Sequence, residues 1–184
     1  MGIRTAEGLL EAYVFEEHME GGRIDEIKQT FARTPGVQFV GQFVGSFSLF
    51  ARVVAADLSE LQNRIKTEYW EAGIHSSWSL NLTASSAAAP KRASPDICAL
   101  VCARAQGDPF EIWEALDASF LRKDEGEGAA VVNARDFDLL VDLGAHTIED
   151  VIDRVSALRA FDGIGRTSTA FANLADNAIR PPKS

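Results

Sequence analysis

Apolar and polar residues alternate along Arg135–Leu143 (RDFDLLVDL), which predicts a β-strand that carries unusually many aspartates. Ninety positions earlier, Gly45–Val53 (GSFSLFARV) has a similar pattern. When residues 47–75 are set over residues 137–165 without a gap, six of 29 positions are identical. We therefore predict that one half of the chain is an altered copy of the other.

The helices that should follow these two strands begin with matching signals. Asp57 and Thr147 each offer a side-chain oxygen three residues before an acid, Glu60 and Asp150, which is the spacing of a capping box. Behind each cap, apolar residues recur at the period of a helix face. Equivalent helix starts at equivalent places strengthen the prediction of a duplication.

The upstream segments agree in kind. Residues 12–15 and 99–103 are typical of strands, residues 23–33 of a helix with one apolar face, and Asp108-Pro109 of a second helix start. Each half is thus predicted to be a ferredoxin-like β-α-β-β-α-β unit. We place the first repeat at 1–83, the second at 97–175, an Ala-, Ser- and Pro-rich linker at 84–96 and a loose tail at 176–184.

The open face of each predicted sheet is too apolar to meet water. Phe50 and Leu140 lie on that face, and both first strands are apolar on their two faces. Burying these surfaces against one another would be the dominant stabilising term. We therefore expect an α+β fold in which two tandem ferredoxin-like repeats pack sheet to sheet as a pseudo-dimer like a dimeric α/β-barrel. Pairing between two chains is the alternative.

The overall charge argues against polyanionic partners. The formal net charge is −9 and the pI is about 4.8, whereas binding to a nucleic-acid backbone requires clustered Lys and Arg. No apolar run approaches the ~20 residues that cross a bilayer, and the first residues lack the apolar core of a signal peptide. We expect a cytoplasmic protein without membrane association. Cys98 and Cys102, four residues apart on one strand, lie too far apart to form a disulfide and are expected to be core residues.

Short motifs in both halves resemble the ligand-binding domain of Lrp/AsnC-type transcription regulators. They are Thr34-Pro-Gly-Val37, the segment Phe39–Leu49 and Ala72-Gly-Ile74 in the first half, and Arg135–Leu140 with Asp162-Gly-Ile164 in the second. The resemblance implies the same element order and a Gly-x-x-Asp turn before the third strand. The first half has Ser48 in place of that aspartate, and the second has Arg135 in place of that glycine.

The resemblance also implies a site for a small, amino-acid-like effector near this turn. Carried over position by position, the candidate ligand-binding residues are Gly45, Ser46, Ser48, Arg135, Asp136 and Asp138. An arginine and an aspartate three residues apart could hold the carboxylate and ammonium of a zwitterion. The alternative is that Asp136 and Asp138 only form the turn. Since the family's helix-turn-helix is missing here, DNA binding would require a partner such as a full-length regulator, and a homo-oligomer is a further expectation.

No catalytic motif stands out. The chain has no phosphate-binding glycine loop, nucleophile elbow or metal-spaced Cys/His cluster, so we expect no catalytic residue, metal or cofactor. The leading hypothesis is a non-catalytic sensing or oligomerisation module in transcriptional regulation. The alternative is a dimeric α/β-barrel enzyme, a cofactor-free monooxygenase or a haem protein, in which His18 or His75 could contribute to a site between the sheets. A scaffold that only mediates assembly is a third hypothesis.

Overall fold

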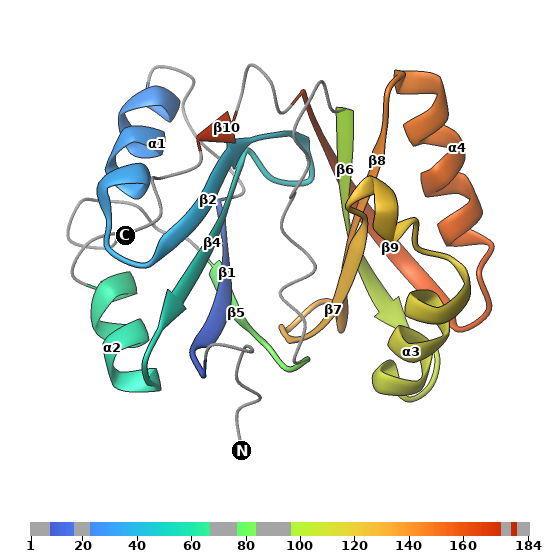
Figure 1. The fold of residues 1–184 in the computed structure, drawn as a ribbon, viewed down its shortest axis with the longest axis horizontal. Helices are drawn as coiled ribbons and strands as arrows, with labels where there is room; N and C mark the ends of the chain where they lie inside the picture. Colours follow the sequence, from blue (N-terminus) through green and yellow to red (C-terminus); the bar gives the residue numbers. More distant parts are fainter. Residues whose placement is uncertain (1–7, 17–22, 67–76, 84–96, 174–177, 180–184) are drawn as a thin grey trace.

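The computed structural model describes residues 8–16, 23–66, 77–83, 97–173 and 178–179. In these residues an antiparallel sheet carries four α-helices (Figure 1). The first half contains β1 (Leu10–Glu16), α1 (Ile24–Arg33), β2 (Val37–Gln42), β3 (Val44–Gly45), β4 (Leu49–Ala55), α2 (Leu58–Asn63) and β5 (Ser77–Asn81). The second half contains β6 (Ile97–Ala105), α3 (Pro109–Ser119), the 3₁₀ helix η2 (Lys123–Glu125), β7 (Gly128–Asn133), β8 (Leu139–Ala145), α4 (Ile148–Arg159) and β9 (Ile164–Asn173), followed by β10 (Ala178–Ile179).

The strands are hydrogen-bonded in the order β10-β2-β4-β1-β5-β7-β8-β6-β9-β3. The blocks β2-β4-β1-β5 and β7-β8-β6-β9 each have the strand order of a ferredoxin-like unit. They join where β5 pairs with β7, and again where β3, in the connection between β2 and β4, pairs with β9. These two junctions bring the blocks face to face in one curled sheet, whose hydrogen-bonded order ends at β10 and β3. The fold is therefore α+β and barrel-like, while the duplication itself remains a prediction.

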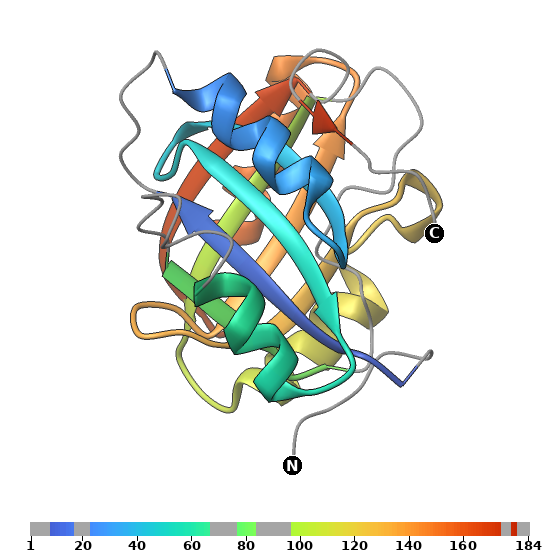
Figure 2. The same cartoon turned by 90° about the vertical axis from the view of Figure 1, so that its left-hand side faces the viewer.

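The two blocks face each other with their helices outside. Figure 1 shows α1 and α2 over the outer face of the first block and α3 and α4 over that of the second, and Figure 2 shows the first block's strands crossing in front of the second's. A hydrophobic cluster lies under each helix pair, and a third fills the space between the blocks. Phe50 and Leu140 belong to this third cluster, which we call the inter-sheet cluster. The predicted burial of the open faces against each other is confirmed within one chain.

The predicted helix starts have the expected capping bonds. Asp57 accepts a hydrogen bond from the Glu60 N–H at 2.8 Å, and the Glu60 carboxylate accepts one from the Ala56 N–H at 2.7 Å, which completes a capping box. Thr147 accepts from the Asp150 N–H at 3.1 Å and Asp108 from the Phe110 N–H at 2.8 Å. The α1 helix also forms, although Arg23 gives it no side-chain cap.

Phe47 and Phe137 each lie three positions before a residue of the open face, Phe50 and Leu140, so strict alternation would place both phenylalanines on the opposite, helix-covered face. Leu49, Leu139 and their strand neighbours pack under the helices, but Phe47 and Phe137 pack into the inter-sheet cluster. The physical reason is that both precede the regular strands β4 and β8, in connections where period-two alternation does not hold. This exception brings two aromatic rings to one end of the inter-sheet space.

The remaining structural predictions have mixed outcomes. Cys98 and Cys102 lie on β6, buried and unbridged, as predicted. Within the predicted tail, β10 pairs with Val40 and Gly41 of β2. The linker at 84–96 and the histidines His18 and His75 lie outside the described residues. No helix in the described part of the chain is long and apolar enough to cross a membrane.

Candidate functional site

A cavity of about 530 Å³ opens at the end of the inter-sheet space where β1 and β6 finish and β5 and β9 begin. Both halves of the chain contribute to it. Its lining residues are Phe15, Ser46, Phe47, Ser77, Trp78, Ser79, Cys102, Ala134, Arg135, Asp136, Phe137, Arg166, Thr167 and Ser168. The volume falls in the range of about 300–1,000 Å³ that is typical of small-molecule and cofactor sites.

The inner wall of the cavity is aromatic. The Phe15 ring meets the Phe47 ring edge to face at a centroid distance of 5.4 Å, and it meets the Phe137 ring in the same way at 5.5 Å. Phe15 and Phe47 are buried, and Phe137 is half-buried. The buried thiol of Cys102 adds a small, weakly polar group. Such a wall favours a flat apolar body over a hydrated one.

The mouth of the cavity is polar and carries excess positive charge. Arg135 and Asp136, in the β7–β8 connection, and Arg166, on β9, are all exposed there. In the described part of the chain neither guanidinium belongs to an ion pair, whereas Arg104 pairs with Asp138 at 3.1 Å. Two arginines against one aspartate leave the mouth suited to a carboxylate, which a guanidinium binds through paired hydrogen bonds.

Three of the six predicted ligand-binding residues line this cavity: Ser46, Arg135 and Asp136. Ser46 also donates from its hydroxyl to the Thr169 carbonyl oxygen at 3.0 Å, which fixes it to β9. A ligand role for these residues remains a prediction, now with a defined cavity.

The other three predicted residues do not line the cavity. Gly45 has a φ of +136°, and a Cβ built there would lie 2.4 Å from the Thr169 carbonyl oxygen, so its role is the β3–β9 junction. The backbone of Ser48 bonds to Phe43 and Glu16. Asp138 accepts from the Ala105 N–H and from Arg104, both at 3.1 Å, so its carboxylate joins the β7–β8 connection to the end of β6. Arg135 and Asp138 therefore do not face the cavity together, as binding the two charges of a zwitterion between them would require.

The contribution of β5 and β9 to the cavity was not predicted from the sequence. Arg166 and Ser168 alternate with outward-facing residues on β9, and Ser77 and Ser79 do the same on β5. On β9 residues 166–169 are all polar, so no alternation marked its inward face, whereas on β5 the polar Ser77 and Ser79 alternate with the apolar Trp78 and Leu80. The alternation on β5 could indicate an inward-facing polar side. No local pattern could show that β5 and β9 would line the same cavity.

A second polar cluster lies between the sheets, further along β1. The Glu11 carboxylate, almost fully buried, accepts hydrogen bonds from Arg52 at 2.7 Å, from the Tyr13 hydroxyl at 2.5 Å and from Asn81 at 3.0 Å. Since each bond joins β1 to itself, β4 or β5, the cluster fixes these three strands to one another. Its carboxylate is well satisfied, and we assign it a structural role.

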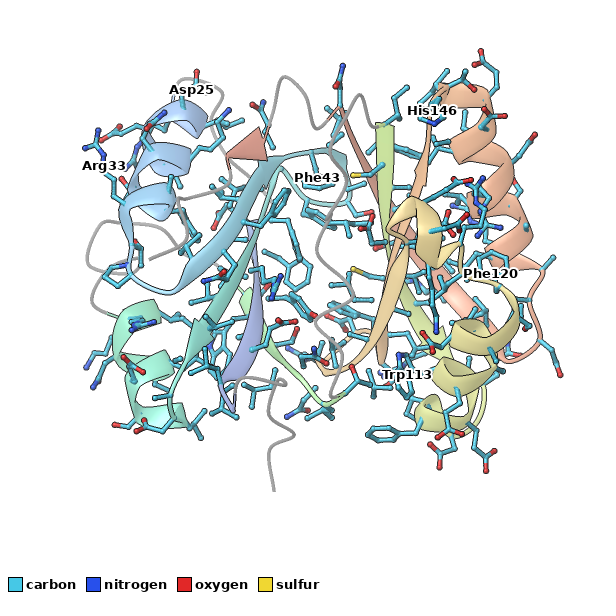
Figure 3. All side chains as sticks on the ribbon, in the orientation of Figure 1. Asp25, Arg33, Phe43, Trp113, Phe120 and His146 are labelled. Atoms are coloured by element: carbon cyan, nitrogen blue, oxygen red, sulfur yellow. The ribbon has the colours of Figure 1, made fainter. Side chains whose placement is uncertain are left out.

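The described residues contain no group of three or more His, Cys, Asp or Glu side chains that could hold a metal ion. His146 is exposed immediately before α4, with its side chain on the outside of the molecule (Figure 3). Phe43, by contrast, lies between the two sheet faces in the same view. The chemistry available at the cavity from the described residues is thus that of guanidinium, carboxylate, hydroxyl, thiol and aromatic groups.

No protein-family model and no curated protein matches this sequence. Solved structures do match its fold. The siroheme decarboxylase NirDL in co-complex with an iron-uroporphyrin III analogue has a TM-score of 0.61 and 9% identity, over 90% of this chain and 71% of that chain. Chlorite dismutase from Candidatus Nitrospira defluvii, in complex with imidazole, has a TM-score of 0.52 and 11% identity, over 92% and 93% of the two chains.

These matches correct the expected function. The expectation of a non-catalytic sensing or oligomerisation module, which leaned against an enzyme, is contradicted, because the solved structures that share the fold are a siroheme decarboxylase and a chlorite dismutase. The finding agrees with the alternative, an enzyme of the dimeric α/β-barrel type. None of the matches supports the Lrp/AsnC resemblance or a role in transcription, although that family shares the ferredoxin-like unit.

Proposed function

We propose that this protein is an enzyme of the dimeric α/β-barrel type that binds a carboxylate-bearing porphyrin in the cavity between its two sheet faces. The observation that carries the proposal is the juxtaposition of Arg135 and Arg166, at the mouth, with the aromatic wall behind them. A porphyrin is a flat apolar ring with acidic side chains at its edge. It therefore requires both kinds of surface in one site.

The lining residues fit such a molecule in two respects. Phe15, Phe47 and Phe137 offer ring edges and faces to a conjugated plane, and offset or edge-to-face contacts of this kind are favourable. Arg135 and Arg166 can each form two parallel hydrogen bonds with a carboxylate. The proposed roles are thus to exclude water from the ring and to orient it by its acidic edge.

The structural comparison supports the choice of ligand. The matching structure of siroheme decarboxylase contains an iron-uroporphyrin III analogue, which supports a porphyrin as the ligand by analogy of fold. A cofactor-free monooxygenase, the other enzyme in our alternative, would not require paired arginines at the mouth.

A bound porphyrin could be substrate or cofactor. As a cofactor, an iron porphyrin would supply redox chemistry at the metal; as a substrate, it would present its carboxylate side chains for removal. Cys102 is the one thiol in the lining of the cavity. In either case the residues described here bind and orient the ring.

An absorption titration tests the proposal. Protein is titrated with iron uroporphyrin and with iron protoporphyrin, and the Soret band is followed for the wild type and for the double variant Arg135→Ala/Arg166→Ala. A saturable band shift that the double variant weakens supports the proposal. Absence of a shift with both porphyrins in the folded wild type contradicts it.

A second arm separates substrate from cofactor. Each porphyrin is incubated with the protein in the absence and presence of oxygen and peroxide and is then recovered for mass spectrometry. Loss of carbon dioxide from the recovered porphyrin indicates a substrate, and recovery of an unchanged porphyrin that stays bound indicates a cofactor.

A further inference from the structure

Ser79 places a buried hydroxyl at the inner part of the cavity. It lies on β5 between Trp78 and Leu80, which pack on the helix side, so its own side chain points between the sheets. Ser79 is only 2% exposed and lines the cavity. Among the described residues its Oγ has no hydrogen-bond partner.

An unpaired hydroxyl at this depth requires an explanation, because nearly all buried polar atoms in native proteins are hydrogen-bonded. The cross-strand neighbour of Ser79 on β1 is Tyr13, whose hydroxyl already bonds to Glu11 and Asn81, and the apolar part of the cavity lining consists of phenylalanine rings and the Cys102 thiol. Rings accept no ordinary hydrogen bond, and a thiol is a weak partner. Because the Oγ is almost inaccessible in the free protein, a molecule in the cavity would become its partner once the hydroxyl rotates toward it.

The charge pattern of the lining limits what this partner can be. Among the described residues, the cations of the lining are Arg135 and Arg166, and both are exposed at the mouth. A carboxylate carried to the depth of Ser79 would be desolvated with only a hydroxyl beside it, which is strongly unfavourable. A neutral acceptor such as a carbonyl oxygen needs one hydrogen bond, and Ser79 can donate it.

We infer that Ser79 selects the ligand by donating a hydrogen bond to a neutral acceptor on its inner edge, while the arginines hold carboxylates on its outer edge. The inference rests on the proposed function. It limits the carboxylate-bearing porphyrins proposed there to a smaller group. The preferred porphyrin has acidic groups on one edge and a carbonyl or similar neutral acceptor on the opposite edge. Ser79 is thus a specificity-determining residue of the site.

Two porphyrins that differ only on one edge test this inference. Deuteroporphyrin and diacetyldeuteroporphyrin carry the same two propionates, and only the second has acetyl carbonyls on the opposite edge. Dissociation constants of both are measured by fluorescence for the wild type, for Ser79→Ala and for Ser156→Ala. Ser156 is an exposed serine on the outer helix α4 whose hydroxyl bonds to the Ile152 carbonyl, so its variant is a matched control.

The wild type and Ser156→Ala should prefer the diacetyl compound by about tenfold, which is the value of one well-placed hydrogen bond. Ser79→Ala should bind both porphyrins equally. The ratio is internal to each variant, so a general loss of affinity does not change it. Equal affinities in the wild type, or an unchanged ratio in Ser79→Ala, would overturn the inference and leave the proposed function standing. Failure of both compounds to bind would overturn the proposed function, and the inference with it.

Discussion

Arg135 and Arg166 lie 31 positions apart in the sequence and line the mouth of the same cavity, one from the β7–β8 connection and one from β9. Neither belongs to an ion pair within the described residues. Two exposed guanidinium groups held beside an aromatic wall form a site for an anion that also has an apolar body. The ligand proposed for this protein follows from that pairing.

Reversing the charge of an arginine at the mouth should weaken porphyrin binding more than replacing that arginine with alanine does. We expect Arg135→Ala and Arg166→Ala each to weaken the affinity by about tenfold and Arg135→Glu to weaken it further, since the glutamate repels the carboxylates. Arg33→Ala, on the outer helix α1 (Figure 3), is the control and should bind as the wild type does. Added salt should reduce the effect of each cavity arginine. Equal binding by Arg135→Glu and the wild type would show that the ring is held elsewhere.

Removing the buried hydroxyl of Ser79 should not destabilise the free protein. An unpaired buried hydroxyl costs about 1–3 kcal/mol, and Ser79→Ala removes that cost for the loss of one oxygen atom. Urea unfolding without ligand should give a free energy of unfolding equal to or above that of the wild type. A loss of stability of 1 kcal/mol or more would show that the hydroxyl already has a structural partner.

Gly45→Ala should open the junction between β3 and β9. The new Cβ would meet the Thr169 carbonyl oxygen, and the φ of +136° is unfavourable for alanine. We expect a loss of about 3 kcal/mol in the free energy of unfolding. Gly107→Ala is the matched control, because the nearest atom to its Cβ is the Ile112 Cδ1 at 4.0 Å. If both variants were equally stable, β3 would contribute nothing to closing the sheet.

Glu127 should make stability depend on pH. Burial raises the pKa of this carboxyl, but the hydrogen bond and charge of Arg154, with N–H donors from Arg122 and Gly144, outweigh burial and hold the pKa below its ordinary value of 4.5. A lowered pKa in the folded state means that the stabilisation is complete above 4.5 and is lost as the pH falls through the folded value. Glu127→Gln should therefore cost about 3 kcal/mol at neutral pH, since it leaves Arg154 without its anion.

The same variant should approach the wild type in acid, where Glu127 is protonated in both the folded and the unfolded state. Urea unfolding of both proteins across this range measures the difference directly. Glu125→Gln, at an exposed ion pair with Arg122, is the control and should change stability by less than about 1 kcal/mol at every pH. A constant difference between Glu127→Gln and the wild type down to acid pH would contradict the assigned ion pair.

Much of the fold follows from local signals. Caps at Asp57, Thr147 and Asp108 mark three helix starts, and the apolar open faces, with Phe50 and Leu140, require a partner surface. The junctions that make the sheet barrel-like could not be predicted, because β3 and β9 pair across more than 120 positions and β3 has only two residues. Local periodicity carries no information about such contacts.

Part of the candidate site, like part of the fold, could be predicted from the sequence. The turn before the third strand resembles that of the Lrp/AsnC-type domain, and this resemblance predicted Ser46, Arg135 and Asp136 as ligand-binding residues. All three line the cavity. The resemblance also included Gly45, Ser48 and Asp138, whose backbone conformation, backbone bonds and contact with Arg104 give them structural roles. Arg166 and Ser79 were missed, since their roles depend on how β9 and β5 meet in space. The expectation of a regulatory module is contradicted by the fold matches to enzymes, and the sequence could not decide between them because the ferredoxin-like unit occurs in regulators and enzymes alike.

The most direct measurement is a crystal structure of the protein grown with diacetyldeuteroporphyrin. The account predicts density for the ring against Phe15, Phe47 and Phe137, with propionates at Arg135 and Arg166 and an acetyl oxygen within hydrogen-bond distance of Ser79 Oγ. An empty cavity in crystals of protein saturated with the porphyrin, or a ring bound on the outer helices, would contradict it.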